Sequence, residues 1–328
     1  MPAFIGNFHL NSLIAFPVTR KTMTVMRTFF LIACAVLATS LISRPGTPPI
    51  YEINHVPLPD ALNKQVCISG TKYMDGKLYF ASERCPLILS IDPETNMINS
   101  IPISVSQEFE MEGMTSYRNK LYMVSENTVA VYEADISTGA IKKIETSIPL
   151  PPKSKDGDGM EGIAANDRDN KFYLLRERND DMTRSQIYIF SIEPGSEDNS
   201  FSLKYESMIE MPLENRQWRY SDICYDKEND RLLCLKSFSK GKLRQQFLES
   251  IDVDKKGNLD AASLKNVPVE KFSDISNQYK DQGYSMNLEG ITVDKQGNIY
   301  LVSDNTSGKA QCDSPAREKT ILLKLEKK

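Results

Sequence analysis

The stretch that decides the fold spans residues 161–177 and reads EGIAANDRDNKFYLLRE. An apolar run comes first, a polar turn follows at 167–170, and a second apolar run leads to Glu177. Asp and Asn tolerate the positive φ angles of tight reversals, so the stretch predicts a β-hairpin. Residues 172–175 are apolar at every position, which indicates a strand covered on both faces.

The same pattern occurs at five places in the chain, each with two apolar runs joined by a polar turn. The copies span residues 69–83, 112–126, 161–177, 221–237 and 289–304. Two further strand-like runs follow a copy, as at 86–91 and 98–103 after the first. Four strands per repeat make one blade of a β-propeller, in which sheets stack face to face around an axis.

The last repeat is one strand short. It supplies a final run at 320–325, while a strand-like run at 50–56 belongs to no repeat. We therefore predict an all-β fold, a five-bladed β-propeller whose N-terminal strand completes the last blade and removes the open sheet edge. Six blades are the alternative, if the long interval 221–289 contains a degenerate blade. No helical periodicity stands out, which disfavours α/β folds.

The chain divides into a leader, residues 1–45, and a single propeller domain, residues 46–328. The leader has no acidic residue and carries an apolar run at 29–42 behind Arg27. This run is short for a membrane span and is typical of a signal peptide.

The leader therefore predicts export, with a periplasmic or secreted location. Three fates of the leader stay open: a cleaved signal, an uncleaved anchor at residues 27–42, and lipidation at Cys34, because residues 31–34 resemble a lipobox. We expect contact with the membrane only through this N-terminal segment.

Composition excludes several classes of protein. The formal net charge is −4 with 26% charged residues, so we expect no nucleic-acid partner, and we expect a monomer. The chain has two histidines, His9 and His55, and His9 lies in the leader. A Ser-His-Asp triad or a histidine-rich zinc site would have to be built on His55 alone.

Five cysteines lie beyond the leader: Cys67, Cys85, Cys224, Cys234 and Cys312. An odd number leaves one of them unpaired, so at most two disulfides can form. Cys224 and Cys234 fall on neighbouring predicted strands, where they are either a disulfide pair or two small buried residues.

A short motif, Glu-Gly followed by Ile or Met, recurs at 112–114, 161–163 and 289–291. With the segments 173–179 and 299–305, it resembles the bacterial SdiA-regulated propeller family and the neighbouring family named esterase-like activity of phytase. The resemblance spans about residues 50–328. It implies a compact exported propeller with a calcium site at the mouth of its channel. Ser69 and Ser221 replace the leading Glu in the first and fourth repeats, so the leading positions do not supply a complete ring of five carboxylates.

Acidic residues recur at two equivalent positions of the repeat. The innermost strand begins with Glu112, Glu161 and Glu289, and the second strand ends with Glu126, Glu177 and Asp304. Antiparallel pairing puts both sets on one face of the propeller. Crowded carboxylates need a cation or protons, and an oxygen-only set favours calcium, so we predict a calcium site from these six residues. The alternative is structural hydrogen bonding to neighbouring blades.

The predicted function is an exported calcium-binding propeller that serves as a ligand-binding, sensor or scaffold domain. Whether it is an enzyme stays open. The alternative is a calcium-dependent hydrolase of phosphate or carboxylic esters, in which Glu161 activates water and Arg178 or Arg84 holds the anion. Both hypotheses place a small-molecule or anionic ligand at the channel mouth.

Two further segments near the predicted mouth have more than one interpretation. Residues 153–159 resemble a calcium loop without its full spacing, which favours a solvated turn. Trp218 could stack on a ligand, although a single Trp is more often part of the packing.

Overall fold

The computed structural model describes residues 51–59, 62, 66–105, 109–155, 158–196, 200–241, 243–272, 275–305, 312 and 314–328. All of them belong to one compact unit, Pro49–Lys328. The residues for which a signal peptide, an anchor at residues 27–42 or lipidation at Cys34 is predicted lie outside the described residues. Within the described part of the chain, no helix is long and apolar enough to cross a membrane.

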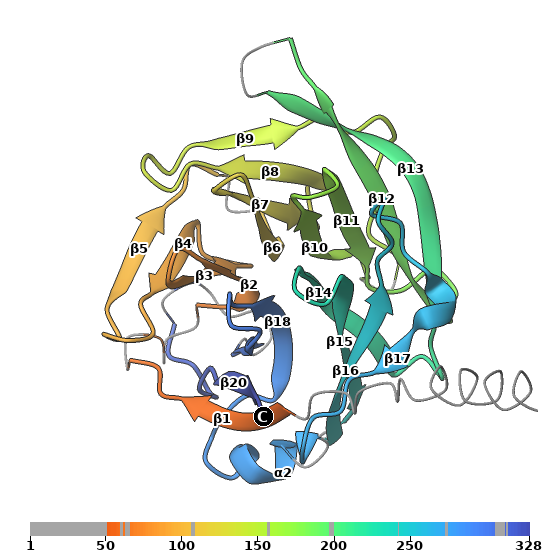
Figure 1. The fold of residues 1–328 in the computed structure, drawn as a ribbon. Coiled ribbons are helices and arrows are strands. Elements are labelled where there is room, and N and C mark those ends of the chain that lie inside the picture. Colours follow the sequence, from red (N-terminus) through yellow and green to blue (C-terminus); the bar gives the residue numbers. More distant parts are fainter. Residues whose placement is uncertain are drawn as a thin grey trace, which may run out of the picture. The chain divides into compact units, whose positions relative to one another are not determined.

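Five four-stranded antiparallel sheets form a ring, with β2, β6, β10, β14 and β18 facing its centre (Figure 1). Blade one consists of β2 (Ile68–Met74), β3 (Lys77–Ser82), β4 (Leu87–Ile91) and β5 (Ile98–Pro102). Blade two consists of β6 (Met111–Tyr117), β7 (Lys120–Ser125), β8 (Ala130–Ala134) and β9 (Ile141–Ile144). Blade three consists of β10 (Met160–Asn166), β11 (Lys171–Arg176), β12 (Arg184–Pro194) and β13 (Phe201–Pro212). Blade four consists of β14 (Trp218–Asp226), β15 (Arg231–Lys240), β16 (Leu243–Asp252) and β17 (Lys265–Asn266).

Blade five is built from both ends of the domain. It consists of β18 (Asn287–Val293), β19 (Ile299–Asp304), β20 (Leu322–Lys327) and β1 (Tyr51–Val56). Strand β1 pairs with β20 in antiparallel register, from Tyr51 opposite Lys327 to Val56 opposite Leu322. The predicted all-β propeller with five blades and an N-terminal closing strand is therefore confirmed.

The alternative of six blades is wrong, because the long interval 221–289 holds no additional sheet among its described residues. The interval is long because β15 and β16 have 10 residues each and because it contains two short helices. These are η2 (Ala261–Ser263) and α2 (Ile275–Lys280).

The second strand of each blade is buried on both faces, as its apolar sequence predicts. Strands β11 and β19 are buried at every position. Their side chains form apolar clusters between neighbouring blades. At the junction of blades one and five, for example, Leu78 and Phe80 lie in one cluster with Tyr300 and Val302. Burial of these faces supplies most of the stabilisation of the ring.

One disulfide joins Cys85, just after β3, to Cys312, between β19 and β20, with their Cα atoms 5.3 Å apart. It links blade one to blade five, beside the junction that β1 closes. Cys224 and Cys234 are buried thiols, so the disulfide alternative for this pair is wrong. The strand register explains this: Cys224 lies opposite Leu233 and Cys234 opposite Ile223, which puts the two thiols on opposite faces of the sheet.

The repeated Glu-Gly motif has a packing role at the centre of the ring. A Cβ atom on Gly113 would lie 2.6 Å from the Cα of Gly162 on the next blade, so only glycine allows this approach. A Cβ on Gly70 would lie 2.3 Å from the carbonyl oxygen of Glu112. Blade four has Asp222 at this position, and its Oδ2 accepts a hydrogen bond from the Ile291 N–H of blade five at 2.9 Å.

The pairing of each innermost strand shifts register at the same motif. In blade three the shift lies between Met160 and Gly162, and in blade five it lies between Leu288 and Gly290. The other three innermost strands shift at equivalent points. A β-bulge redirects the side chain beside it, so each blade can turn its leading residue into the mouth of the channel.

Candidate functional site

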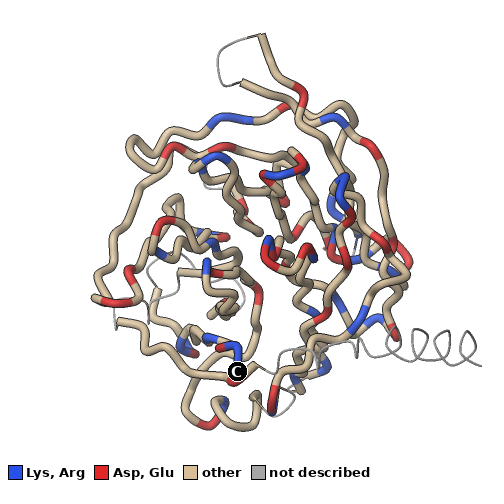
Figure 2. Tube along the Cα trace, viewed as in Figure 1, with Lys and Arg blue, Asp and Glu red and all other residues tan. Residues whose placement is uncertain are grey.

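The mouth of the channel is an acidic cavity of about 290 Å³. All six residues predicted as metal ligands line it: Glu112, Glu126, Glu161, Glu177, Glu289 and Asp304. Glu83, Asp158, Arg178 and Arg219 complete the lining. Figure 2 shows acidic and basic residues interspersed around the ring, so the acidic lining is a local feature of the mouth.

Arg219, on β14, lines this site and was not predicted from the sequence. Its Nη1 donates to Glu177 Oε1 at 2.8 Å, and its Nη2 donates to Glu289 Oε1 at 2.7 Å. These ion pairs explain the pKa of Glu177: burial alone would raise it, but Arg219 and Arg178 outweigh burial and hold the pKa below its usual range. Arg219 thus compensates part of the negative charge of the carboxylates that line the mouth.

The departure of blade four from the repeat was the available signal for Arg219. Ser221 and Ser237 stand where other blades have carboxylates, and their hydroxyls lie 3.3 Å apart. The short side chains bring no charge, and the same blade supplies a guanidinium two residues before Ser221. The sequence shows the missing carboxylates, but only the fold shows that Arg219 reaches the mouth.

Lys153 is a second basic side chain that compensates the acidic lining, because it forms an ion pair with Glu126. Its ammonium donates to Glu126 Oε2 and, at 3.4 Å, to Glu110 Oε2. Burial, partly offset by Lys153, raises the pKa of Glu126 to about 7. One carboxylate oxygen from each of Glu110, Glu112 and Glu126 lies within 4.8 Å of the other two. Glu126 Oε1 is buried and has no hydrogen-bond partner among the described residues.

The segment 153–159 contributes to the site, although its sequence favours a solvated turn. Asp158 is 2% exposed and lines the cavity, so the solvated turn is wrong for this residue. Asp156 and Gly157 lie outside the described residues. Arg178 Nη2 donates to Asp158 Oδ1, and Arg178 Nη1 donates to the Arg216 carbonyl at 2.7 Å. Arg178 is therefore held by protein groups.

The negative charges of Glu112 and Glu161 are compensated least by neighbouring basic groups. The Ser69 hydroxyl donates to Glu112 Oε2, and the charge of nearby Arg219 lowers the pKa of Glu161 without outweighing burial. Burial, followed by the nearby carboxylates, raises the pKa of both groups well above its ordinary value. Burial likewise raises the pKa of Glu289, to about 8, against the opposing effect of Arg219.

Two other candidates lie apart from the acidic cavity. Arg84 does not line it, and its Nη2 donates to Glu83 Oε1 at 2.8 Å. The Trp218 ring packs against Phe238 and Phe247, with ring centroids 5.0 and 5.4 Å away. Trp218 therefore serves packing, the alternative to ligand stacking.

Comparison with solved structures finds proteins of low sequence identity. Glutaminyl cyclase from Myxococcus xanthus is 12% identical with a TM-score of 0.47, covering 86% of this chain and 100% of that one. An α-L-arabinofuranosidase from Podospora anserina is 9% identical with a TM-score of 0.47, covering 85% and 97%. Aldose sugar dehydrogenase from Streptomyces coelicolor is 12% identical with a TM-score of 0.45, covering 85% and 100%. None of these structural similarities gives information on what the acidic cavity binds or catalyses.

The comparison with protein families gives a direct match. The SdiA-regulated family model matches residues 68–306, which is more than half of the chain. The match includes all three Glu-Gly motifs and every residue of the acidic cavity. On this match, together with the five-bladed ring, the chain belongs to the SdiA-regulated family.

Proposed function

We propose that the protein is a calcium-binding propeller whose channel mouth holds the ion and receives a ligand. The observation that carries this proposal is the buried Glu126 Oε1, which has no partner among the described residues and lies in a cavity lined by eight carboxylates and two guanidiniums. A buried carboxylate oxygen without a partner is costly, and a cation bound there would offset that cost. An oxygen-only donor set suits calcium.

The pairing pattern narrows the ligand set. Glu177 and Glu289 are already bound to Arg219, whereas Glu112 and Glu161 have no ion pair within the described residues. Glu126 pairs with Lys153 through Oε2 only, which leaves Oε1 for an ion. We therefore place the ion beside Glu112, Glu126 and Glu161, on blades two and three. Glu177, Glu289 and Asp304 would contact the ion through water molecules or contribute to the negative electrostatic potential around it.

Ligand binding is better supported than hydrolysis. In the hydrolase alternative, Glu161 is the base and Arg178 holds the anion. Arg178 is engaged by Asp158 and by the Arg216 carbonyl, so little of its guanidinium is left for a substrate. The raised pKa of Glu161 suits a general base, but the same carboxylate would be a metal ligand.

Thermal unfolding tests the calcium proposal. Calcium at about 100 times its Kd should add ~3 kcal/mol to the free energy of unfolding, and a chelator should remove this gain. Glu161→Gln should weaken the response to calcium and leave the melting temperature in chelator nearly unchanged. Burial and the neighbouring carboxylates raise the pKa of Glu161, so a neutral amide at this position removes little favourable charge. Glu193→Gln, which removes an exposed partner of Lys204, is the matched control and should respond as the natural protein does.

If neither calcium nor chelator moves the melting temperature, the acids are structural and the hydrolase loses its Lewis acid as well. An unchanged calcium response in Glu161→Gln would instead remove Glu161 from the ligand set.

We also propose export. The Cys85–Cys312 disulfide supports it, because disulfides persist mainly in oxidising compartments. Residues 1–45 fused to a reporter should carry it across the bacterial inner membrane, and a reporter left in the cytosol would contradict the proposal.

A further inference from the structure

A second cavity, of about 470 Å³, adjoins the acidic mouth and has the opposite character. Four arginines line it: Arg178, Arg216, Arg219 and Arg244. It shares Arg178, Arg219 and Glu289 with the acidic cavity, so the two are continuous. Its one carboxylate, Glu289, accepts hydrogen bonds from Arg219 and, at 2.6 Å, from Asn287 Nδ2.

Two of the four arginines keep their charge without a carboxylate. Among the described residues, no acidic group lies within 4.0 Å of Arg216 or Arg244. Arg244 Nη1 donates to the Ser239 hydroxyl and, at 3.3 Å, to the Gly241 carbonyl, which are neutral acceptors. Burial and the nearby Arg219 lower the pKa of Arg244 more than Glu318 and Glu289 raise it, so an anion placed there would stabilise the charged guanidinium.

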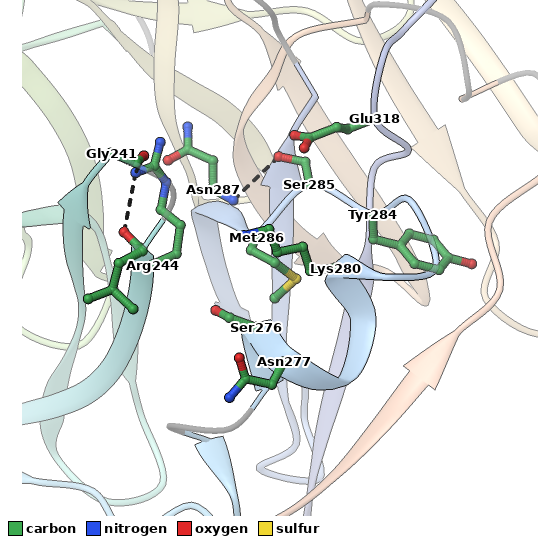
Figure 3. Close-up of a pocket in the computed structure, with 11 residues that line it drawn as sticks. Gly241, Arg244, Ser276, Asn277, Lys280, Tyr284, Ser285, Met286, Asn287 and Glu318 are labelled. Carbon is green, nitrogen blue, oxygen red and sulfur yellow. Dashed lines mark hydrogen bonds between the residues drawn. The ribbon is translucent and has the colours of Figure 1, made fainter.

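The arginine cavity continues into a third cavity, of about 460 Å³, with which it shares Arg244 and Asn287. Figure 3 shows Arg244 and Asn287 at one side of this third cavity and Tyr284 at the other, with Met286 between them. Met286 and Tyr284 line it together with Arg244, and the Tyr284 ring also packs against His55, with ring centroids 4.9 Å apart. One carboxylate, Glu318, lines this cavity as well. Volumes of this size are typical of sites for small organic ligands.

We propose that this groove binds a small organic oxyanion, with its phosphate or carboxylate held by Arg244 and Arg216 and its organic body in the cavity of Tyr284 and Met286. Guanidinium groups bind both oxyanions through paired N–H donors. The inference deepens the proposed function, because it names the class of ligand. Its arginines are separate from the proposed calcium ligands, so the two sites can fail independently.

Calorimetric titration of the full chain with phenyl phosphate, benzoate and neutral benzamide tests the proposal, in chelator and again in calcium. At least one of the two anions should bind in chelator, and benzamide should not. Comparison of the two anions tells phosphate from carboxylate preference. Arg244→Gln should weaken binding about tenfold or more, the loss expected for a charge-assisted hydrogen bond.

Arg216→Gln provides a second variant if Arg244→Gln does not fold, because the Arg216 side chain is exposed. Arg184→Gln is the matched control, since Arg184 is an exposed partner of Glu210 and lines none of these cavities. Absence of binding by both anions, or equal binding by the natural protein and both cavity variants, would overturn the proposal. Binding that requires calcium and ignores the arginine variants would also overturn it and would assign the anion to the metal.

Discussion

At the scale of single residues, the electrostatics of the mouth depend on a few cations that the repeat does not predict. Arg219 bonds to Glu177 and Glu289, and Lys153 bonds to Glu126. These side chains compensate part of the acidic lining, and protonation compensates another part. The sequence alternatives of a metal site and a structural network are therefore not exclusive, since both kinds of contact fit within one cavity.

The raised pKa values predict how stability changes with pH in the absence of calcium. Glu126 and Glu289 have pKa values of about 7 and about 8 in the folded protein, above their ordinary value of 4.5. Between the unfolded pKa of 4.5 and these folded pKa values, the folded state binds more protons than the unfolded state. The free energy of unfolding therefore falls as pH rises. From pH 6 to pH 8, we expect the free energy of unfolding in chelator to fall by on the order of 4 kcal/mol.

Urea unfolding at the two pH values, with chelator and with calcium, measures this effect. Calcium should reduce or reverse the loss, because the ion binds the ionised carboxylates. Glu126→Gln should flatten the profile in chelator. A free energy of unfolding that rises with pH in chelator would show that these acids are ionised in the folded protein.

At the scale of elements, the Glu-Gly motif serves both the packing of the blades and the placement of the carboxylates at the mouth. The glycine lets the innermost strands of neighbouring blades approach, and the bulge beside it turns the leading Glu toward the mouth. The motif thus sets the inner contact of the ring and the position of the carboxylates together.

Gly113→Ala tests the packing role of the motif. The added methyl group would lie 2.6 Å from both the Gly162 Cα and the Ile163 backbone nitrogen, which cannot move independently of blade three. We expect a loss of about 2–4 kcal/mol in the free energy of unfolding, measured by urea denaturation. Gly76→Ala is the control: no atom lies within 4 Å, and its φ of +80° should cost only about 1 kcal/mol. Equal losses in the two variants would contradict the inter-blade role.

At the scale of the whole molecule, the ring is closed twice. Strand β1 pairs with β20, and the Tyr51 ring is fully buried while its hydroxyl accepts a hydrogen bond from Arg231 Nη2 at 3.0 Å. The Cys85–Cys312 disulfide joins blades one and five separately. Both devices act where the ends of the chain meet, which is where an open propeller would expose a sheet edge.

Removal of the closing strand tests this arrangement. A chain that begins at residue 59 should be less stable to heat and urea than a chain that begins at residue 46, by at least ~3 kcal/mol, because it loses a strand and the buried Tyr51. Equal unfolding curves for the two chains would show that β1 contributes nothing to closure.

The sequence by itself determined the repeat, the closing strand and the six acids that meet at the mouth. It favoured five blades, and the described part of the structure excluded six. The repeat, the closing strand and the acids follow from local rules, since turn chemistry, apolar runs and equivalent positions in a repeat need no knowledge of distant contacts. Even the shared face of Glu112 and Glu126 follows from antiparallel pairing alone.

Only the tertiary structure decided which charges reach the mouth from outside the repeat. Arg219, Lys153 and Asp158 occupy no repeated position, so their places depend on how bulges and loops turn within the assembled ring. The cysteine pairing was decided in the same way, because Cys85 and Cys312 are 227 residues apart in sequence and meet only when the ring closes. Contacts of this kind depend on the register and rotation of whole blades, which no local pattern encodes.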